Sequence, residues 1–354
     1  MKVFNLNTRI DRQIIHQGKT YHYFSGTSYL GIDLVPEFQE QVVIGMEQYG
    51  LNHGLSRINS VRLQIFDQFE NYFAKETEAE AALSMSSGYL AGIAALQYLS
   101  KGTDQIWVAP DTHPAILPIE LKPDATQEFE DWKNECLEKS SNAEPQKILV
   151  LGNAVNPMLP EIHDYSWLVQ IAEKHEVSLL IDDSHAFGIL GKGIFGTFSQ
   201  WKNLPLKLVV TGSLGKGLGL PAGIILGDQN TCKAIKNLPI YGGASPCPPA
   251  YLYAFLNAKI VYEERRVRLI QLIKYFSKKN KIPEHIKGEE NYPVFSYRPE
   301  SWVEKFEANK IITSSFPYPT SKDPSVNRII ISAFHNAEDI DSIWSYINKI
   351  YKSK

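Results

Sequence analysis

Apolar positions along the chain follow two different spacings. Between residues 61 and 77 they recur every three or four positions, which predicts an amphipathic helix, and helical patterns also cover 36–48, 89–99 and 166–174. Short apolar runs between these stretches predict buried strands at 81–84, 105–109, 147–151, 177–181, 206–211 and 223–226. Alternating strands and helices predict an α/β fold in which helices cover both faces of a mostly parallel sheet.

The pattern changes after Gly242. Residues 251–268 predict one long helix, which is followed by a strand, a helix, a strand at 328–332 and a final helix. With 354 residues, the chain suits one large and one small domain. We expect an N-terminal arm at 1–40, a large domain at 41–240 and a small C-terminal α/β domain at 241–354, with a connecting helix between the domains.

Composition and charge narrow the class of protein. Hydrophobic residues make up 44% and charged residues 21%, with a net charge of −3, so nothing favours binding to nucleic acid or to an anionic membrane. The first residues lack the apolar core of a signal peptide, and no apolar run approaches the roughly 18–20 residues that span a bilayer. Cys136, Cys232 and Cys247 are scattered, without metal-type spacing. We expect a cytoplasmic protein.

The most informative segment is 209–223, where an apolar strand leads into a glycine-rich loop around Lys216. A phosphate-binding P-loop would need Ser or Thr directly after the lysine and then a helix, but Gly217 and another strand-like run follow. The dinucleotide-binding pattern fails for the same reason. Two interpretations stay open: a lysine that forms a Schiff base with an aldehyde cofactor, and a surface turn with a solvated lysine.

A second segment, 179–188, ends an apolar strand with Asp182, Asp183 and His185. Ligands of open α/β sheets bind at the carboxyl ends of strands, so a carboxylate here can pair with a protonated ring nitrogen. An acidic strand end that only caps the next helix is an equal alternative. A metal site is a third, although no further clustered ligands accompany it, and we predict no metal.

Two weaker signals precede these segments. Ser87 and Gly88 stand between a predicted strand and a predicted helix, and the start of a helix suits a phosphate. His113 follows the strand that ends at Ala109, where an imidazole can stack on a flat ring. Alone, the first pattern is more typical of a helix cap and the second of a loop histidine.

Taken in order, the four segments resemble the α-oxoamine synthase family of pyridoxal phosphate (PLP) enzymes. This family of fold type I includes 8-amino-7-oxononanoate synthase, 2-amino-3-ketobutyrate CoA ligase and serine palmitoyltransferase, and belongs with the class II aminotransferases. Asp-Asp-Ser-His-Ala-Phe-Gly (182–188) and Ser-Leu-Gly-Lys-Gly-Leu-Gly (213–219) carry the likeness, which extends from residue 29 to residue 335. The resemblance implies a homodimer with a seven-stranded type of sheet, acting on an amino acid and an acyl-CoA or acyl-carrier thioester.

The resemblance also implies roles around the ring of the cofactor. Lys216 would hold PLP as a Schiff base and later move protons at the substrate Cα. Asp182 would pair with the pyridine nitrogen, His185 would contact the 3-hydroxyl and His113 would stack on the ring. We count Lys216, His113 and His185 as candidate catalytic residues.

Further roles concern the phosphate and the substrate. Ser87, Gly88 and Tyr89 would hold the phosphate at a helix start, and Ser213 would add another contact. Arg328 falls where the family places an arginine for the substrate α-carboxylate, although the pattern suits a surface strand residue equally well.

Several positions depart from the family pattern. Thr27 stands where the family has Asn, and residues 152–159 replace a stretch typical of the family, so that Asn156 takes the place of a serine that contacts the ring hydroxyl. Ala244 and Ser245 stand in a loop that would reach the partner subunit's phosphate. These changes fall on the substrate side, which leaves three functions to compare: thioester condensation, another PLP reaction such as transamination or retro-aldol cleavage, and a non-catalytic relative.

Overall fold

The computed structural model describes residues 3–52, 54–124, 126–156, 158–318 and 322–352, which divide into two compact units. One unit is formed by residues 1–35, 158–161 and 261–354, and the other by 36–157 and 162–260. The first is called here the small unit and the second the large unit. Each has its own sheet.

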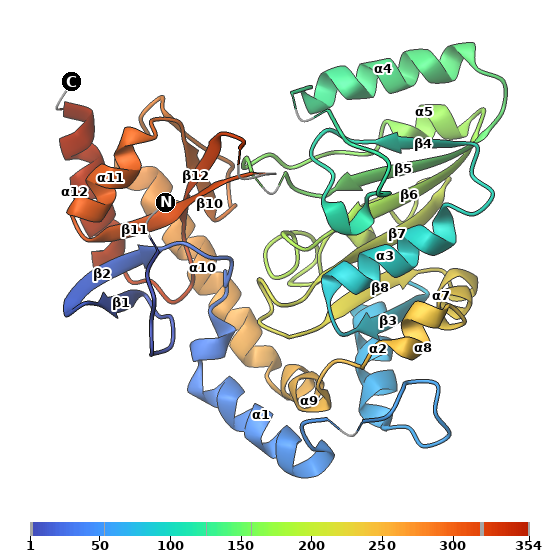
Figure 1. The fold of residues 1–354 in the computed structure, drawn as a ribbon, viewed down its shortest axis with the longest axis horizontal. Coiled ribbons are helices and arrows are strands. Elements are labelled where there is room, and N and C mark those ends of the chain that lie inside the picture. The colour runs from blue at the N-terminus through green and yellow to red at the C-terminus, as the bar shows by residue number, and fades with distance from the viewer. Residues whose placement is uncertain (1–2, 53, 125, 157, 319–321, 353–354) are drawn as a thin grey trace. The chain divides into compact units, whose positions relative to one another are not determined.

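The large unit is built on a six-stranded sheet in the order β3-β8-β7-β6-β5-β4 (Figure 1). Its strands are β3 (Ala81–Met85), β4 (Gln105–Val108), β5 (Lys147–Asn153), β6 (Glu176–Asp182), β7 (Lys207–Ser213) and β8 (Gly223–Gly227). Strands β4 to β7 pair in parallel, whereas β8 is antiparallel to both β7 and β3. Because β3 therefore runs in the same direction as β7, five strands bring their carboxyl ends to one edge of the sheet.

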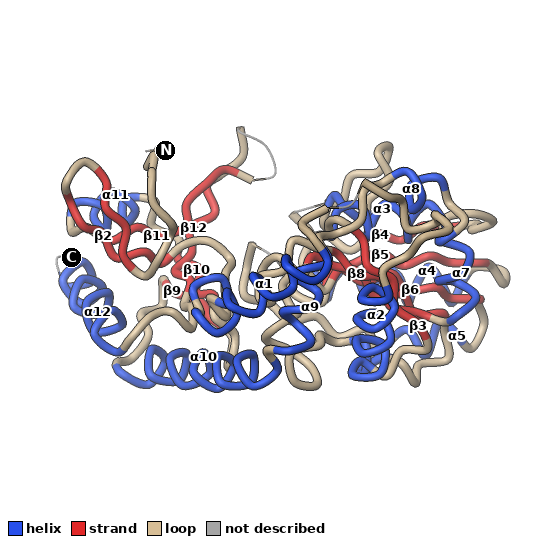
Figure 2. Tube along the Cα trace, turned by 90° about the horizontal axis from the view of Figure 1, so that it is seen from below, coloured by secondary structure: helices blue, strands red, loops and turns tan. Residues whose placement is uncertain are grey.

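Helices cover both faces of this sheet, as the views in Figures 1 and 2 show. On one face, helices α3, α7 and α8 pack against apolar side chains of the strands, such as Leu149, Leu151 and Leu180. Leu149 and Leu151 point to the same face because side chains alternate along a strand. The helices of the large unit are α1 (Pro36–Tyr49), α2 (Gln64–Thr77), α3 (Gly88–Leu99), α4 (Phe129–Asn142), α5 (Leu168–Ala172), α6 (Phe198–Trp201), α7 (Gln229–Lys236), α8 (Pro239–Gly243) and α9 (Pro249–Asn257), with a 3-10 turn η2 (Pro114–Ile116).

The small unit has a second six-stranded sheet, in the order β1-β2-β11-β12-β10-β9. Its strands are β1 (Gln13–His16), β2 (Lys19–Phe24), β9 (Ile286–Gly288), β10 (Val294–Tyr297), β11 (Ile311–Pro317) and β12 (Ser325–Ile330). Strands β2 and β11 pair in parallel, and the other described strand pairs of this sheet are antiparallel. The helices are α10 (Lys259–Lys279), α11 (Ser301–Ala308) and α12 (Ala337–Lys352), with η1 (Ile32–Leu34), and the boundary between the units falls within α10.

All six strands predicted for the large domain are present as β3 to β8, and the mostly parallel α/β sheet is confirmed. The sheet has six described strands rather than the seven of the family type. The helix predicted at 251–268 is wrong: α9 ends at Asn257, Ala258 leaves the helical conformation (φ −109°, ψ 30°), and α10 continues to Lys279. No helix among the described residues is both long enough and apolar enough to cross a bilayer.

The bounds of the compact units differ from the predicted domains. The N-terminal residues do not form a separate arm, because β2 adds to the sheet of the small unit beside β11. Residues 241–260 lie in the large unit, where Gly45 of α1 packs against Ala250 of α9. Sequence patterns show where elements begin, but they do not show which sheet an N-terminal strand will join.

Candidate functional site

The start of α3 forms a cradle of backbone groups against the end of β7. Ser87 is the N-cap, and its side-chain oxygen accepts a hydrogen bond from the Leu90 N–H at 3.2 Å. A Cβ added at Gly88 would lie 2.3 Å from the backbone nitrogen of Ser213, and one at Gly223 would lie 2.2 Å from the Ser87 carbonyl oxygen. Only glycine permits this approach, which brings the start of α3 directly against Ser213 at the end of β7.

Asp182 and His113 meet at the same edge of the sheet, since Asp182 ends β6 and His113 follows β4. The Asp182 carboxylate is buried, and its Oδ1 accepts the Ser184 N–H at 2.7 Å. Its Oδ2 lies 3.6 Å from Nδ1 of His113. That contact is not an ion pair, because Nδ1 already accepts the Ala115 N–H at 3.1 Å and therefore carries no proton.

The charge state of His113 follows from its surroundings. Burial lowers the pKa of His113, the Asp182 carboxylate opposes that shift, and the positive charge of Lys216 adds to the lowering. The imidazole is therefore neutral near pH 7, which leaves its flat face uncharged. Lys216 stands three residues after the end of β7, which is parallel to β6, so the topology of the sheet brings it to the same edge as Asp182.

The loop that carries Lys216 is held on both sides of the lysine. A Cβ at Gly217 would lie 2.1 Å from the Phe187 carbonyl oxygen, and Gly219 has a φ of 64°, which favours glycine. The Leu214 N–H donates to the Ala222 carbonyl at 2.9 Å. The loop is followed by β8 and not by a helix, which excludes the P-loop and dinucleotide interpretations. Lys216 itself is half-buried rather than fully solvated.

Asp183 has a structural role. Its carboxylate is fully buried and accepts the Thr197 N–H at 2.6 Å and the Thr197 hydroxyl at 2.7 Å. Burial raises the pKa of Asp183 to about 7. His185, two residues on, is half-buried. Among the described residues, no group of three acidic, His or Cys side chains has the arrangement of a metal site, so Asp182, Asp183 and His185 do not form one.

The remaining predicted residues differ in how exposed they are. Tyr89 is 53% exposed at the start of α3, Asn156 is half-buried three residues beyond β5, and Pro157 beside it lies outside the described residues. Arg328 belongs to β12 of the small unit, where it is only 4% exposed and its Nη2 donates to the Ser314 hydroxyl at 3.3 Å. The interpretation of Arg328 as a surface strand residue is therefore wrong.

The residues at this edge suit a phosphorylated pyridine aldehyde. The α3 start with its glycine cradle fits a phosphate, and the half-buried lysine fits an aldehyde. The buried Asp182 carboxylate presents Oδ2 as an acceptor at this edge, which suits a bound proton donor such as a pyridinium N–H. These features match PLP.

Sequence reasoning missed the polar side chains that support this site. Asn153 ends β5 directly beside Asp182 in the register of the sheet, and its amide bonds both to His113 and to Asp111. His163 in turn contacts Asp111. The position of Asn153 at a strand end was the available signal, whereas His163 is too distant in the chain for any local pattern to indicate it.

Comparisons with known proteins agree with the geometry of the site. A family model described as aminotransferase class I and II matches residues 47–347. The 8-amino-7-oxononanoate synthase of Lysinibacillus sphaericus is 26% identical over 366 residues, which covers 98% of this chain and 92% of that protein. The 8-amino-7-oxononanoate synthase of Petrotoga mobilis is 26% identical over 357 residues, which covers 95% of this chain and 90% of that protein.

Two solved structures have the same fold. A serine palmitoyltransferase from S. paucimobilis superposes with a TM-score of 0.81 at 14% identity, covering 99% of this chain and 92% of that one. An 8-amino-7-oxononanoate synthase from Francisella tularensis superposes with a TM-score of 0.70 at 21% identity, covering 94% of this chain and 98% of that one. The chain therefore belongs to the class I and II aminotransferase family, and the names of its curated relatives agree with the resemblance to the α-oxoamine synthases. It is a PLP-dependent enzyme of fold type I, as its two specific motifs predicted.

Proposed function

We propose that this enzyme condenses an amino acid with an acyl thioester, using Lys216 as the covalent anchor of PLP. The observation that carries the proposal is the contact of His113 with Asp182 at the sheet edge where β7 leads to Lys216, beside the glycine-built start of α3. The names of the curated relatives, which are 8-amino-7-oxononanoate synthases, support this reaction class.

The proposed division of labour follows from the chemistry of each side chain. Bound PLP supplies an electron sink for the charge that develops at the substrate α-carbon. Asp182 keeps the ring nitrogen protonated, His113 stacks on the ring, and His185 and Asn156 bind near the 3-hydroxyl. Lys216 Nζ would carry a proton to or from the α-carbon. The α-carbon would form a bond to the acyl carbonyl carbon while the carbon–sulfur bond breaks and the thiolate leaves.

Substrate and phosphate groups have their own partners in this proposal. The N–H groups and the hydroxyl of Ser87, Gly88 and Tyr89, with Ser213, bind the phosphate. Arg328 binds the α-carboxylate of the amino acid, since a guanidinium can hold a carboxylate by two hydrogen bonds. Burial lowers the pKa of Arg328, which does not remove its charge near neutral pH.

We further propose a cytoplasmic homodimer whose active sites include the partner's Ala244–Ser245 loop. Exposed apolar side chains of the large unit on α1 and in the loop after it support an interface: Val43, Met46, Leu51, Ile58 and Val61. All three cysteines are unpaired with one another and buried, which suits a reducing compartment.

The test supplies purified enzyme and PLP with glycine, alanine or serine and a panel of acyl-CoA thioesters, and measures free CoA. We expect CoA release that requires both substrates and is absent in Lys216→Ala. If no pair releases CoA, while an amino acid alone converts the cofactor to its amine form with release of a keto acid, the enzyme is an aminotransferase and the condensation proposal is wrong.

A further inference from the structure

Asn153 occupies a buried position inside the stretch where the chain departs from its family. It is the last residue of β5 and only 3% exposed. Its amide oxygen Oδ1 accepts the backbone N–H of His113 at 3.2 Å. Its amide nitrogen donates to the backbone oxygen of Asp111 and to Asp111 Oδ2, the latter at 3.3 Å. One side chain thus spans both ends of the Asp111–His113 turn.

The Asp111 carboxylate is in turn held by a second layer of buried groups. His163 is 6% exposed, and its Nε2 lies 2.9 Å from Asp111 Oδ2. The imidazole of His163 stacks on Phe129, with ring centroids 4.0 Å apart and planes 8° from parallel. The Tyr165 hydroxyl donates to the backbone oxygen of Asn153 at 2.9 Å. Rings and hydrogen bonds together leave this network little freedom.

The network determines which way the Asn153 amide faces. A carboxylate and a carbonyl only accept hydrogen bonds, so the NH₂ group must face Asp111 and the oxygen must face the N–H of His113. His113 is therefore held at its backbone by Asn153 and at Nδ1 by the Ala115 N–H at 3.1 Å. Both restraints act on the residue whose imidazole lies beside Asp182.

We propose that Asn153, with Asp111 and His163 behind it, is a positioning residue that fixes the imidazole of His113 over the cofactor. This inference rests on the proposed role of His113 in stacking on PLP. Asn153 acts only through His113, so its removal loosens the cofactor by freeing that imidazole and in no other way.

The test is a double-mutant cycle on cofactor binding, made with Asn153→Ala, His113→Ala and the double variant. The dissociation constant of PLP is measured by absorbance titration, and the orientation of the bound cofactor by visible circular dichroism. Asn153→Ala removes the hydrogen bonds to both ends of the turn, so we expect PLP binding about tenfold weaker, with a smaller visible dichroism band. In the His113→Ala background, the same substitution leaves both quantities unchanged.

Two further variants separate positioning from general destabilisation. His163→Phe keeps the stacked ring but removes the hydrogen bond to Asp111, and we expect PLP binding weakened about threefold. Thr231→Ala is the matched control: it removes a buried hydroxyl that donates to Asp228 at 2.6 Å. Thr231 follows the end of the antiparallel strand β8, at the opposite edge of the sheet, so its replacement lowers thermal stability without changing PLP affinity.

The outcomes are distinguishable from failure of the proposed function. If the wild type binds PLP but Asn153→Ala weakens binding equally with and without His113, Asn153 does not act through His113 and the inference is wrong. The same conclusion follows if Asn153→Ala binds as tightly as the wild type. If the wild type itself binds no PLP, the proposed function fails together with this inference.

Discussion

Replacement of Gly88 by alanine is the sharpest perturbation of the proposed phosphate cradle. The added Cβ would lie 2.3, 2.5 and 2.7 Å from the nitrogen, Cα and Cβ of Ser213. The end of β7 cannot yield, because the Ser213 N–H donates to the Ser184 hydroxyl at 2.8 Å and Ser213 pairs with Gly223. The start of α3 must therefore move away from β7.

The size of the effect combines steric crowding with a weakened hold on the phosphate. Overpacking of this kind costs about 1–3 kcal/mol of folding stability. Loss of one charge-assisted hydrogen bond from a helix-start N–H to the phosphate costs about 1.5–3 kcal/mol, which corresponds to roughly 10- to 100-fold weaker PLP binding. Absorbance titration of the purified variant with PLP measures the affinity, and thermal unfolding of the apoenzyme measures the stability.

Gly45→Ala provides the matched control for Gly88→Ala. Its Cβ would lie 2.7 Å from the Ala250 carbonyl oxygen, so it disturbs the packing of α1 on α9 by a comparable clash. We expect a similar loss of thermal stability in this variant but unchanged affinity for PLP. If Gly88→Ala binds PLP as tightly as the wild type, or if both variants weaken binding equally, the start of α3 does not hold the phosphate.

Three further predictions concern charge. Arg57 forms a buried ion pair with Glu70 (Nη1 to Oε1, 2.8 Å). Arg57→Met leaves that carboxylate unpaired, so we expect the free energy of unfolding, measured with urea, to fall by about 3–5 kcal/mol and to be largely recovered in Arg57→Met/Glu70→Leu. Equal stability of the single and double variants would refute this. Burial lowers the pKa of His335 to about 4 from 6.5. Its contribution to stability is therefore present above pH 6.5 and is lost as the pH falls toward 4, by up to about 3 kcal/mol. The free energies of unfolding at pH 7.5 and pH 4.5 should then differ less in His335→Gln than in the wild type, and equal differences would contradict the prediction. Asp182→Asn should keep bound PLP but lower the rate of CoA release about 10- to 100-fold, because a charged hydrogen bond to the ring nitrogen is lost; an unchanged rate would remove Asp182 from the mechanism.

The sequence predicted the strands of the large unit better than it predicted the interactions that support the candidate site. Lys216, Asp182 and Ser87 are candidates from sequence because each lies at or shortly after the end of an apolar strand, and parallel strands bring their carboxyl ends to one edge. The antiparallel placement of β8 could not be foreseen from its apolar run, because periodicity gives no direction. Nor could the pairing of β2 with β11, because the paired residues His22 and Ile311 come from opposite ends of the chain.

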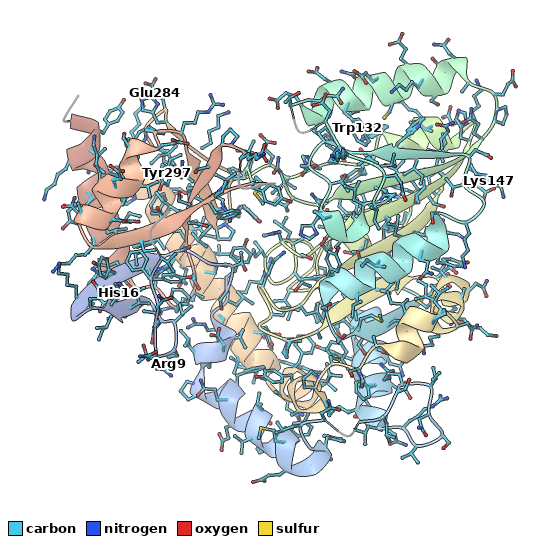
Figure 3. All side chains as sticks on the ribbon, in the orientation of Figure 1. Arg9, His16, Trp132, Lys147, Glu284 and Tyr297 are labelled. Carbon is cyan, nitrogen blue, oxygen red and sulfur yellow. The ribbon has the colours of Figure 1, made fainter. Side chains whose placement is uncertain are left out.

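Interactions between distant residues were also beyond prediction. Glu70 lies on α2 and is buried, a position that a helical pattern assigns to an apolar residue. The structure explains it through Arg57 and through Ser84, whose N–H and hydroxyl both donate to Glu70. Figure 3 labels Lys147 at the amino end of β5 and Trp132 on α4; Asn153 lies at the other end of β5, at the edge of the site. Only the register of the sheet reveals that Asn153 is the neighbour of Asp182.

The covalent attachment of PLP to Lys216 is the claim on which the rest depends. Reduction of the PLP-loaded enzyme with borohydride makes that bond permanent, and proteolysis with mass spectrometry then identifies the labelled lysine. The structure predicts one labelled peptide, the one that contains Lys216, and no label in Lys216→Ala. A label on another of the lysines, or a wild-type protein that takes up no label, would contradict the account.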